Sequence, residues 1–229
     1  MLWDVDHTLV SVCSVGRELY AVAFREMFGR ELPPTAASMV GRTDRAIAVD
    51  ILAGAGIPDP HGQVDKLQAI QAMHAPSMAR EISVQGRVLP GVPEALAAVA
   101  AGRAGIRVTQ SVLTGNLRAL AEVKLGTLGV TDHLDLEAGA YGSESEIRAD
   151  LVPVARRNAA ARYGADFGGA DTVLVGDTPL DIEAALASGA RAVGVATGSF
   201  GVAELAEAGA HAALPDLTDP APVLAAVLG

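Results

Sequence analysis

Two acidic residues follow the first apolar segment of the chain, spaced so that they can act together. Asp4 and Asp6 lie in the sequence LWDVDHTLV, in which Leu2–Val5 is predicted to form a short strand. Side chains at positions i and i+2 of a strand point the same way, and Thr8 continues that face. Ligands of open α/β sheets bind beyond the carboxyl ends of the strands, so a site is expected here. The alternative is a solvated loop in which Asp6 or Thr8 caps a helix.

A second acidic pair follows another apolar segment. Asp177 and Asp181 come after the strand predicted at Thr172–Val175, and helix capping explains only one of them. Four carboxylates at one sheet edge repel one another, and some would protonate unless a cation were bound. Oxygen ligands without a histidine or cysteine partner select Mg²⁺ rather than zinc, and the histidines of this chain are scattered. Asp4, Asp6, Asp177 and Asp181 are therefore the candidate metal ligands.

A third polar segment, SVLTGN, ends a further predicted strand. Within Ser111–Asn116, the Thr114 hydroxyl and the permissive backbone of Gly115 are suited to holding a phosphate oxygen. The alternative is an ordinary turn between a strand and a helix. The same segment ends in Asn116, which together with Thr114 and Gly115 makes up the candidate substrate-binding loop.

The elements that must position these residues alternate from Gly91 onward. The predicted strands are Ile106–Leu113, Leu134–Glu137, Thr172–Val175, Ala192–Ala196 and Ala212–Leu214. The predicted helices are Val92–Ala101, Leu117–Leu128, Asp150–Tyr163, Pro179–Ser188, Val202–Ala208 and Pro222–Leu228. This alternation predicts an α/β fold with a Rossmann-like parallel sheet and helices on both of its faces.

The first ninety residues have a different pattern. After the first strand come about seventy residues that favour helices, at Val15–Phe28, Thr43–Ala53 and Gln63–Arg80. Thr43 is a plausible N-cap of the second. We therefore predict an α/β core made of residues 1–11 and 85–229, with an α-helical insertion at residues 12–84.

Composition and charge exclude several classes of protein. The chain has 229 residues, 27 acidic and 17 basic side chains, and a formal net charge of −10, which argues against a nucleic acid partner. Residues 12–84 hold eight acids and seven bases, so nearly all of the acidic excess lies in the core. The chain has no apolar stretch of about 18 residues that would span a membrane. Asp4 and Asp6 occupy the place of a signal peptide, and Cys13 is the single cysteine, so we expect a cytoplasmic protein.

These motifs together resemble the haloacid dehalogenase superfamily of hydrolases over essentially the whole chain. The family's first motif, hhhhDxDxT, matches residues 2–8, the second matches Thr114, and the fourth, GDxxxD, matches Gly176–Asp181. The helical insertion between the first two motifs resembles the family's C1 cap. Its segment VGRTDRAI, Val40–Ile47, is similar to the substrate-facing motif of phosphoglycolate phosphatase-like members.

The resemblance implies a role for each matching residue. Asp4 would be the nucleophile that forms an aspartyl-phosphate, and Asp6 the general acid and base. Mg²⁺ would be held by the Asp4 carboxylate, the Asp6 backbone carbonyl and Asp177, with Asp181 in support. Thr114 would bind a phosphoryl oxygen. The implied substrate is a small phosphorylated metabolite, and the implied enzyme is a monomer or homodimer.

The sequence departs from the family at the third motif, which is usually a lysine. The chain has only two lysines, Lys66 in the insertion and Lys124 in the middle of a predicted helix, where a structural role is commoner. Arg148 has the expected position between the second and fourth motifs, so we favour it over Lys124 as a catalytic cation. In the insertion, Arg42 is a candidate partner for an anionic part of the substrate.

Three other functions are weighed against a Mg²⁺-dependent phosphatase. A sugar phosphomutase of the same superfamily would share all four motifs. A catalytically idle binding protein would not need the intact acids Asp4, Asp6, Asp177 and Asp181. A nucleotide-binding dehydrogenase would need a GxGxxG turn after the first strand, whereas the glycines of Gly54–Gly56 follow a helix.

Overall fold

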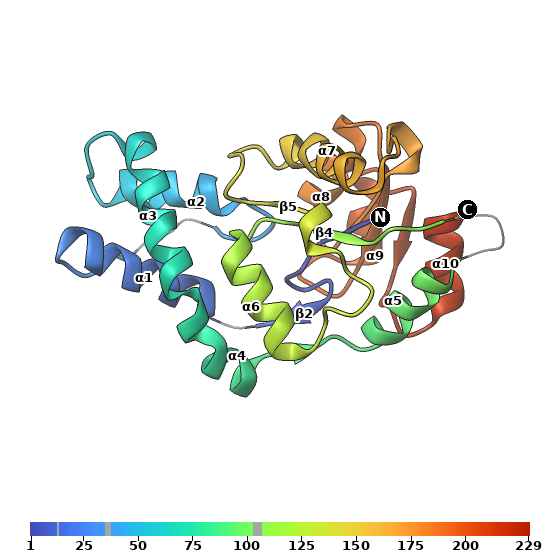
Figure 1. Ribbon diagram of the computed structural model, residues 1–229, viewed down its shortest axis with the longest axis horizontal. Helices are drawn as coiled ribbons and strands as arrows, with labels where there is room; N and C mark the ends of the chain where they lie inside the picture. The colour runs from blue at the N-terminus through green and yellow to red at the C-terminus, as the bar shows by residue number, and fades with distance from the viewer. Residues whose placement is uncertain (13, 35–37, 103–106) are drawn as a thin grey trace.

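In the described part of the chain, six short parallel strands form the central sheet (Figure 1). The computed structural model describes residues 1–12, 14–34, 38–102 and 107–229. The strands run in the order β5-β4-β1-β6-β7-β8, so the chain turns from one side of β1 to the other between β5 and β6. Such a switch point is where α/β sheets bind ligands. The strands are β1 (Leu2–Trp3), β4 (Ser111–Thr114), β5 (Ala140–Tyr141), β6 (Val173–Gly176), β7 (Arg191–Val195) and β8 (Ala212–Leu214).

Helices cover both faces of this sheet, which confirms the predicted α/β fold. Val173 and Val175 of β6 belong to one hydrophobic cluster, while Leu174 belongs to the other, because alternate strand residues point to opposite faces. The first cluster includes residues of α5, α6 and α10, and the second residues of α7, α8 and α9. The helices are α5 (Val92–Ala101), α6 (Arg118–Leu128), α7 (Leu151–Tyr163), α8 (Pro179–Ala187), α9 (Val202–Glu207) and α10 (Pro220–Leu228). Short 3-10 turns lie at Ala75–Met78, Leu136–Ala138, Arg148–Asp150 and Gly169–Asp171.

The described part of residues 12–86 is mainly helical and has its own hydrophobic cluster. Its helices are α1 (Val15–Phe28), α2 (Asp44–Gly54), α3 (Pro60–His74) and α4 (Ala79–Gln85). Tyr20 and Phe24 of α1 pack with Ile47 of α2 and Leu67 of α3, to one side of the sheet (Figure 1). The Thr43 side chain accepts a hydrogen bond from the Ala46 amide, as expected of the N-cap of α2. The division into a core and a cap at residues 12–84 stays a prediction.

Two features join this helical insertion to the rest of the protein. A mixed cluster packs Leu19 of α1 and Ile82 of α4 against Leu117 and Leu120 of the α6 region. A two-stranded antiparallel ribbon, β2 (Val10–Ser11) with β3 (Arg87–Val88), lies where the chain enters and leaves the insertion. The two connecting segments are thus held together by main-chain hydrogen bonds.

One predicted strand is wrong. Leu134–Glu137 alternates apolar and acidic residues like a strand, but Leu136–Ala138 forms a 3-10 turn and the strand follows at β5. The Asp135 carboxylate accepts from the Glu137 amide, and this local bond closes the turn in place of a ladder. The strand predicted at Ile106–Leu113 is shorter and later, at Ser111–Thr114; Ile106 and Cys13 lie outside the described residues. Among the described residues no helix is both long and apolar enough to cross a membrane.

The indole of Trp3 lies at the centre of the sheet, and we predict that loss of its hydrogen-bond partner lowers the stability of the protein. Trp3 is fully buried, and its Nε1 donates to Gln110 Oε1 at 3.0 Å, while Gln110 Nε2 donates to the Leu96 carbonyl at 2.9 Å. Gln110→Leu leaves the buried indole N–H and the Leu96 carbonyl without this partner, so we expect a loss of about 1–3 kcal/mol of unfolding free energy. Urea denaturation measures it. The exposed Gln85→Leu should change stability by less than about 0.5 kcal/mol, and equal losses in both variants would contradict the assignment.

Candidate functional site

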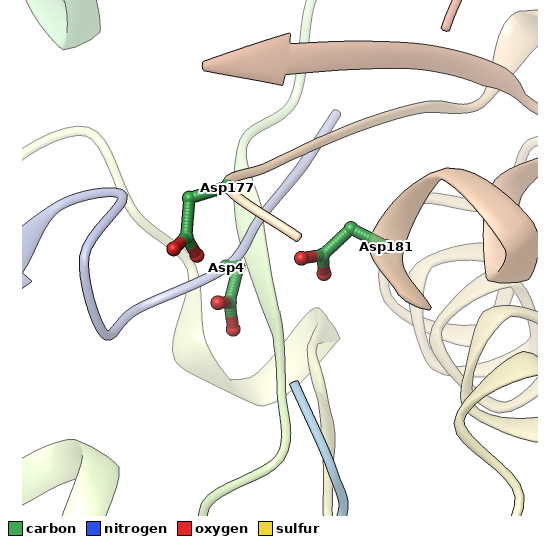
Figure 2. A group of neighbouring side chains, drawn as sticks. All are labelled: Asp4, Asp177 and Asp181. Carbon is green, nitrogen blue, oxygen red and sulfur yellow. The ribbon is translucent and has the colours of Figure 1, made fainter. Parts of the chain in front are cut away.

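The acidic residues of the first and fourth motifs meet at the carboxyl edge of the sheet. Asp4 directly follows β1 and Asp177 directly follows β6, and these two strands are parallel neighbours. The Asp4 amide donates to the Val175 carbonyl at 2.8 Å, which keeps the two strand ends in register. Asp181 lies on the first turn of α8. The three carboxylates lie close together (Figure 2), and one oxygen of each lies within 4.8 Å of the others.

Burial and mutual repulsion raise the pKa values of two members of this carboxylate cluster, which we define as Asp4, Asp177 and Asp181. Burial raises the pKa of Asp4 to about 7, against the lowering effect of Arg148. Burial, followed by the charges of Asp4 and Asp181, raises the pKa of Asp177 to about 8. Carboxylates with such values hold protons near neutral pH unless a cation replaces them. The oxygen-only donor set fits a hard divalent cation.

Glycines at two positions allow the carboxylate cluster to be this compact. A Cβ at Gly198 would lie 1.8 Å from Asp177 Oδ2, and a Cβ at Gly176 would lie 2.2 Å from Asp181 Cγ. Neither carboxylate could keep its place beside a larger residue. These two glycines therefore shape the cluster, and Gly198, which follows β7, is a site residue that the sequence motifs do not indicate.

Asp181 also has a local structural function. Its Oδ2 accepts from the Thr178 hydroxyl at 2.7 Å and from the Thr178 amide at 3.1 Å, and its own amide donates back to the Thr178 hydroxyl. This capping box begins α8. One oxygen of Asp181 is thereby committed to the helix, and only Oδ1 faces the other acids.

Arg148 is the cation that contacts the cluster. Its Nη2 lies 2.9 Å from Asp4 Oδ1 and 2.5 Å from Asp181 Oδ1, and its Nη1 donates to the Gly41 carbonyl at 3.1 Å. The guanidinium is 7% exposed, so little water screens these contacts. Although burial opposes it, the charges of Asp181 and Asp4 raise the pKa of Arg148 above its ordinary value. Arg148 therefore sits beside the predicted nucleophile. Asp177 forms no ion pair with any described residue.

Asp6 is separated from the cluster by different partners. Lys124 Nζ lies 2.8 Å from Asp6 Oδ1 and 2.7 Å from Oδ2, and Asn116 Nδ2 donates to Oδ2 at 2.7 Å. Burial raises the pKa of Asp6, but Lys124 and Asn116 outweigh it and hold the pKa below its usual value. Lys124 also donates to Asn116 Oδ1 at 2.8 Å, so the three side chains form one network.

The contact between Lys124 and Asp6 was not foreseen from the sequence. Its signal is the position of Lys124 on the buried face of α6, which also carries Leu117, Leu120, Ala121 and Leu125 at helical spacing. A lysine that is 4% exposed on such a face needs an anionic partner. Nothing in the local sequence says that the partner is Asp6.

A pocket of about 360 Å³ opens onto these groups and is lined by the predicted substrate-binding residues. Thr114, Gly115 and Asn116 border it from the core, and Arg42 borders it from the insertion. The Asn116 amide and side chain both donate to the Thr114 hydroxyl, at 3.2 and 2.8 Å, which fixes that oxygen in the loop. Arg42 is paired with Asp50 of α2 at 2.7 Å.

Comparison with known proteins agrees with the resemblance of the motifs. A family model for haloacid dehalogenase-like hydrolases matches residues 1–186. No curated protein matches the chain in sequence. The family match includes every predicted site residue from Asp4 to Asp181.

Several solved structures have the same fold. A hydrolase from Pseudomonas syringae is 21% identical, with a TM-score of 0.62, covering 95% of this chain and 94% of its own. A protein described as a predicted phosphatase, from Clostridium acetobutylicum, is 15% identical with a TM-score of 0.65, covering 99% and 96%. A protein provisionally described as a β-phosphoglucomutase, from Thermotoga maritima, is 20% identical with a TM-score of 0.56, covering 99% and 97%. With the sheet order, the insertion and the family match, these likenesses lead to one conclusion: the chain belongs to the haloacid dehalogenase-like hydrolase family.

Proposed function

We propose that this hydrolase is a Mg²⁺-dependent phosphatase that cleaves a small phosphorylated metabolite through an aspartyl-phosphate intermediate. The carboxylate cluster beside a pocket, with Arg148 in contact with Asp4, is the observation that carries the proposal. Membership of the hydrolase family supports it. From the sequence we also predict a cytoplasmic location and a monomeric or homodimeric state.

In the proposed reaction, two aspartates divide the chemistry. A carboxylate oxygen of Asp4 attacks phosphorus, the bond from phosphorus to the ester oxygen breaks, and that oxygen takes a proton from Asp6. Water then attacks the aspartyl-phosphate, Asp6 accepts its proton, and inorganic phosphate leaves with the Asp4 carboxylate restored. The donors from Lys124 and Asn116 favour the ionised form of Asp6, which activates water in the second step. In the first step Asp6 must carry a proton, taken up from solvent, and the negative charge of the bound phosphoryl group favours that form.

Mg²⁺ would be held by the Asp4 carboxylate, the Asp6 backbone carbonyl and Asp177, with Asp181 in support. The ion would supply positive charge to the phosphoryl oxygens and offset the repulsion within the cluster. Arg148 supplies charge from the other side, as the residue that we propose for the third motif. An arginine can do this in place of lysine, although it binds with a planar fork rather than a point charge.

Residues from both the core and the insertion line the pocket and would bind the substrate. The Thr114 hydroxyl and the Gly115 backbone would bind the phosphoryl group, because they lie at the end of β4 beside Asp4 and Asp6. Asn116, whose side-chain donors go to Asp6 and Thr114, would complete this loop by holding the Thr114 hydroxyl in place. Arg42 would meet an anionic group of the metabolite beyond the phosphate. A sugar phosphomutase is the second candidate, supported by the similar Thermotoga maritima protein. It would release little free phosphate, whereas a catalytically idle binding protein would release none.

Metal binding should be visible as thermal stabilisation. The raised pKa values of Asp4 and Asp177 mean that the metal-free protein loses stability as pH rises from about 4, the ordinary carboxyl value, to about 7 to 8. Mg²⁺ must displace those protons, so its stabilising effect should be greater at about pH 9 than at about pH 6. At a hundred times its Kd the ion should add about 2.7 kcal/mol. Thermal unfolding with MgCl₂ or EDTA measures this, and an equal shift in Asp177→Asn would contradict the assignment.

Asp4→Asn tests the nucleophile. The amide cannot form the aspartyl-phosphate, so we expect phosphate release from a panel of phosphorylated metabolites to fall by at least about 10³-fold. The fold should persist, because the substitution also removes a buried charge from a repelling cluster. Asp166→Asn, at an exposed position, is the matched control and should keep wild-type activity. Wild-type release that survives EDTA would remove Mg²⁺ from the mechanism, and retained activity in Asp4→Asn would remove Asp4.

Side-by-side substitutions separate the two buried cations. Arg148→Ala should lower kcat for every phosphate ester by about 10²-fold or more, since Arg148 contacts the nucleophile itself. Lys124→Ala should act through Asp6: without the lysine the pKa of Asp6 rises, so Asp6 is a weaker base toward the attacking water, a step that every ester shares. We therefore expect a similar fall in kcat for alkyl phosphates and for p-nitrophenyl phosphate, partly reversed at higher pH, whereas the loss in Arg148→Ala should not be reversed. Arg148→Lys keeps a cation and should recover part of the loss. Near-wild-type turnover in Arg148→Ala would refute its assignment to the third motif.

A further inference from the structure

One segment of the insertion is hydrogen-bonded directly to the loops of the site. The Asp44 amide donates to the Gly115 carbonyl at 2.6 Å, and the Arg45 amide donates to the Gly142 carbonyl at 2.8 Å. The Thr43 hydroxyl donates to the Glu146 carbonyl at 3.1 Å. Together with the bond from Arg148 to Gly41, these contacts seat residues 41–45, the docking segment, on the core.

The approach is too close for ordinary side chains. A Cβ at Gly115 would lie 2.0 Å from the Arg42 carbonyl oxygen. A Cβ at Gly142 would lie 1.7 Å from the Gly115 carbonyl oxygen and 2.8 Å from the Asp44 amide nitrogen. Two core loops therefore carry glycine where the docking segment lies against them.

Asp44 contributes a buried carboxylate to this interface. It is 6% exposed, and its Oδ2 accepts from the Leu117 amide at 2.6 Å. Leu117 is the N-cap of α6 and has no side-chain acceptor of its own, so a carboxylate from another part of the chain caps this helix. On its other side Asp44 is fixed by the Tyr20 hydroxyl, which donates to its carbonyl at 2.7 Å and to Oδ1 at 3.3 Å.

The capped turn is also the turn that places Asp6. Thr114 and Asn116 lie just before this turn, and Lys124 lies two turns further along α6. Asn116 and Lys124 hold the Asp6 carboxylate with three contacts of 2.7–2.8 Å. A continuous path of contacts thus runs from Tyr20 in the insertion through Asp44 and the start of α6 to Asp6.

We propose that Asp44 is a positioning residue through which seating of the docking segment sets the phosphate-binding loop and the grip of Lys124 and Asn116 on Asp6. Its catalytic consequence rests on the proposed phosphatase function. Asp44 itself touches none of the reacting groups named above. Its substitution should therefore imitate a weakened Lys124–Asp6 contact rather than the loss of Asp4 or Arg148.

Amide hydrogen exchange of the full chain, measured without substrate, tests whether Asp44 orders the loop at the start of α6. In Asp44→Ala, amides of residues 115–120 should exchange at least about tenfold faster, while those of β6 and β7 keep wild-type rates. Asp44→Asn, whose amide oxygen can still accept from Leu117, should restore most of the protection. Asp166→Asn, at an exposed position outside the docking segment, is the matched control and should leave residues 115–120 unchanged. Unchanged exchange in Asp44→Ala, or an equal increase over all strands in both Asp44 variants, would overturn the proposal.

Measurements of turnover test whether Asp44 affects catalysis through the placement of Asp6. Asp44→Ala should lower kcat more than it raises KM, and Asp44→Asn should recover most of the loss. If Asp44 acts through the contact of Lys124 with Asp6, the double variant Asp44→Ala/Lys124→Ala should lose little more activity than Lys124→Ala alone. Fully additive losses would overturn the link to Asp6. If the wild-type protein released no phosphate at all, the proposed function would fail, while the exchange result would still decide whether Asp44 orders the loop.

Discussion

Repulsion among buried carboxylates at one sheet edge is the constraint on which the rest of this structure depends. Asp4, Asp177 and Asp181 meet because β1 and β6 are parallel neighbours and end together. Buried like charges shift toward the protonated form unless cations oppose them, and the raised pKa values of Asp4 and Asp177 express this conflict. The protein reduces the conflict with two buried cations from two different helical segments.

These two cations divide the acids into two environments. Arg148 contacts Asp4 and Asp181, whereas Lys124 and Asn116 hold Asp6 apart and lower its pKa. Asp177 is left facing the shared space, which is where a divalent cation would complete the balance. Different surroundings for neighbouring carboxylates are what a nucleophile and an acid–base group on the same strand end require. The net charge of −10 is therefore compatible with an anionic substrate, because positive charge is concentrated at the site.

The insertion takes part in this arrangement through its backbone. Residues 41–45 are bonded to the loops that carry Gly115, Gly142 and Arg148, and glycine at two of these positions permits the contact. Because the docking segment also brings Arg42 to the pocket, the same contact that orders the core loops closes the pocket from the other side. Under the proposed function, this short segment would couple recognition of the substrate to the arrangement of the core.

The sequence by itself determined the fold class and the strand ends that carry the chemistry. Helical and strand periods reflect local burial, and paired acids after apolar strands mark the carboxyl edge of a parallel sheet. Sequence periodicity failed at Leu134–Glu137, where one side-chain bond from Asp135 closes a turn. Only the tertiary structure decided the partners of the charges: that Arg148 faces Asp4, that Lys124 holds Asp6, and that Asp44 caps α6. Such contacts join residues more than thirty positions apart, and no local pattern records which buried charge will meet which.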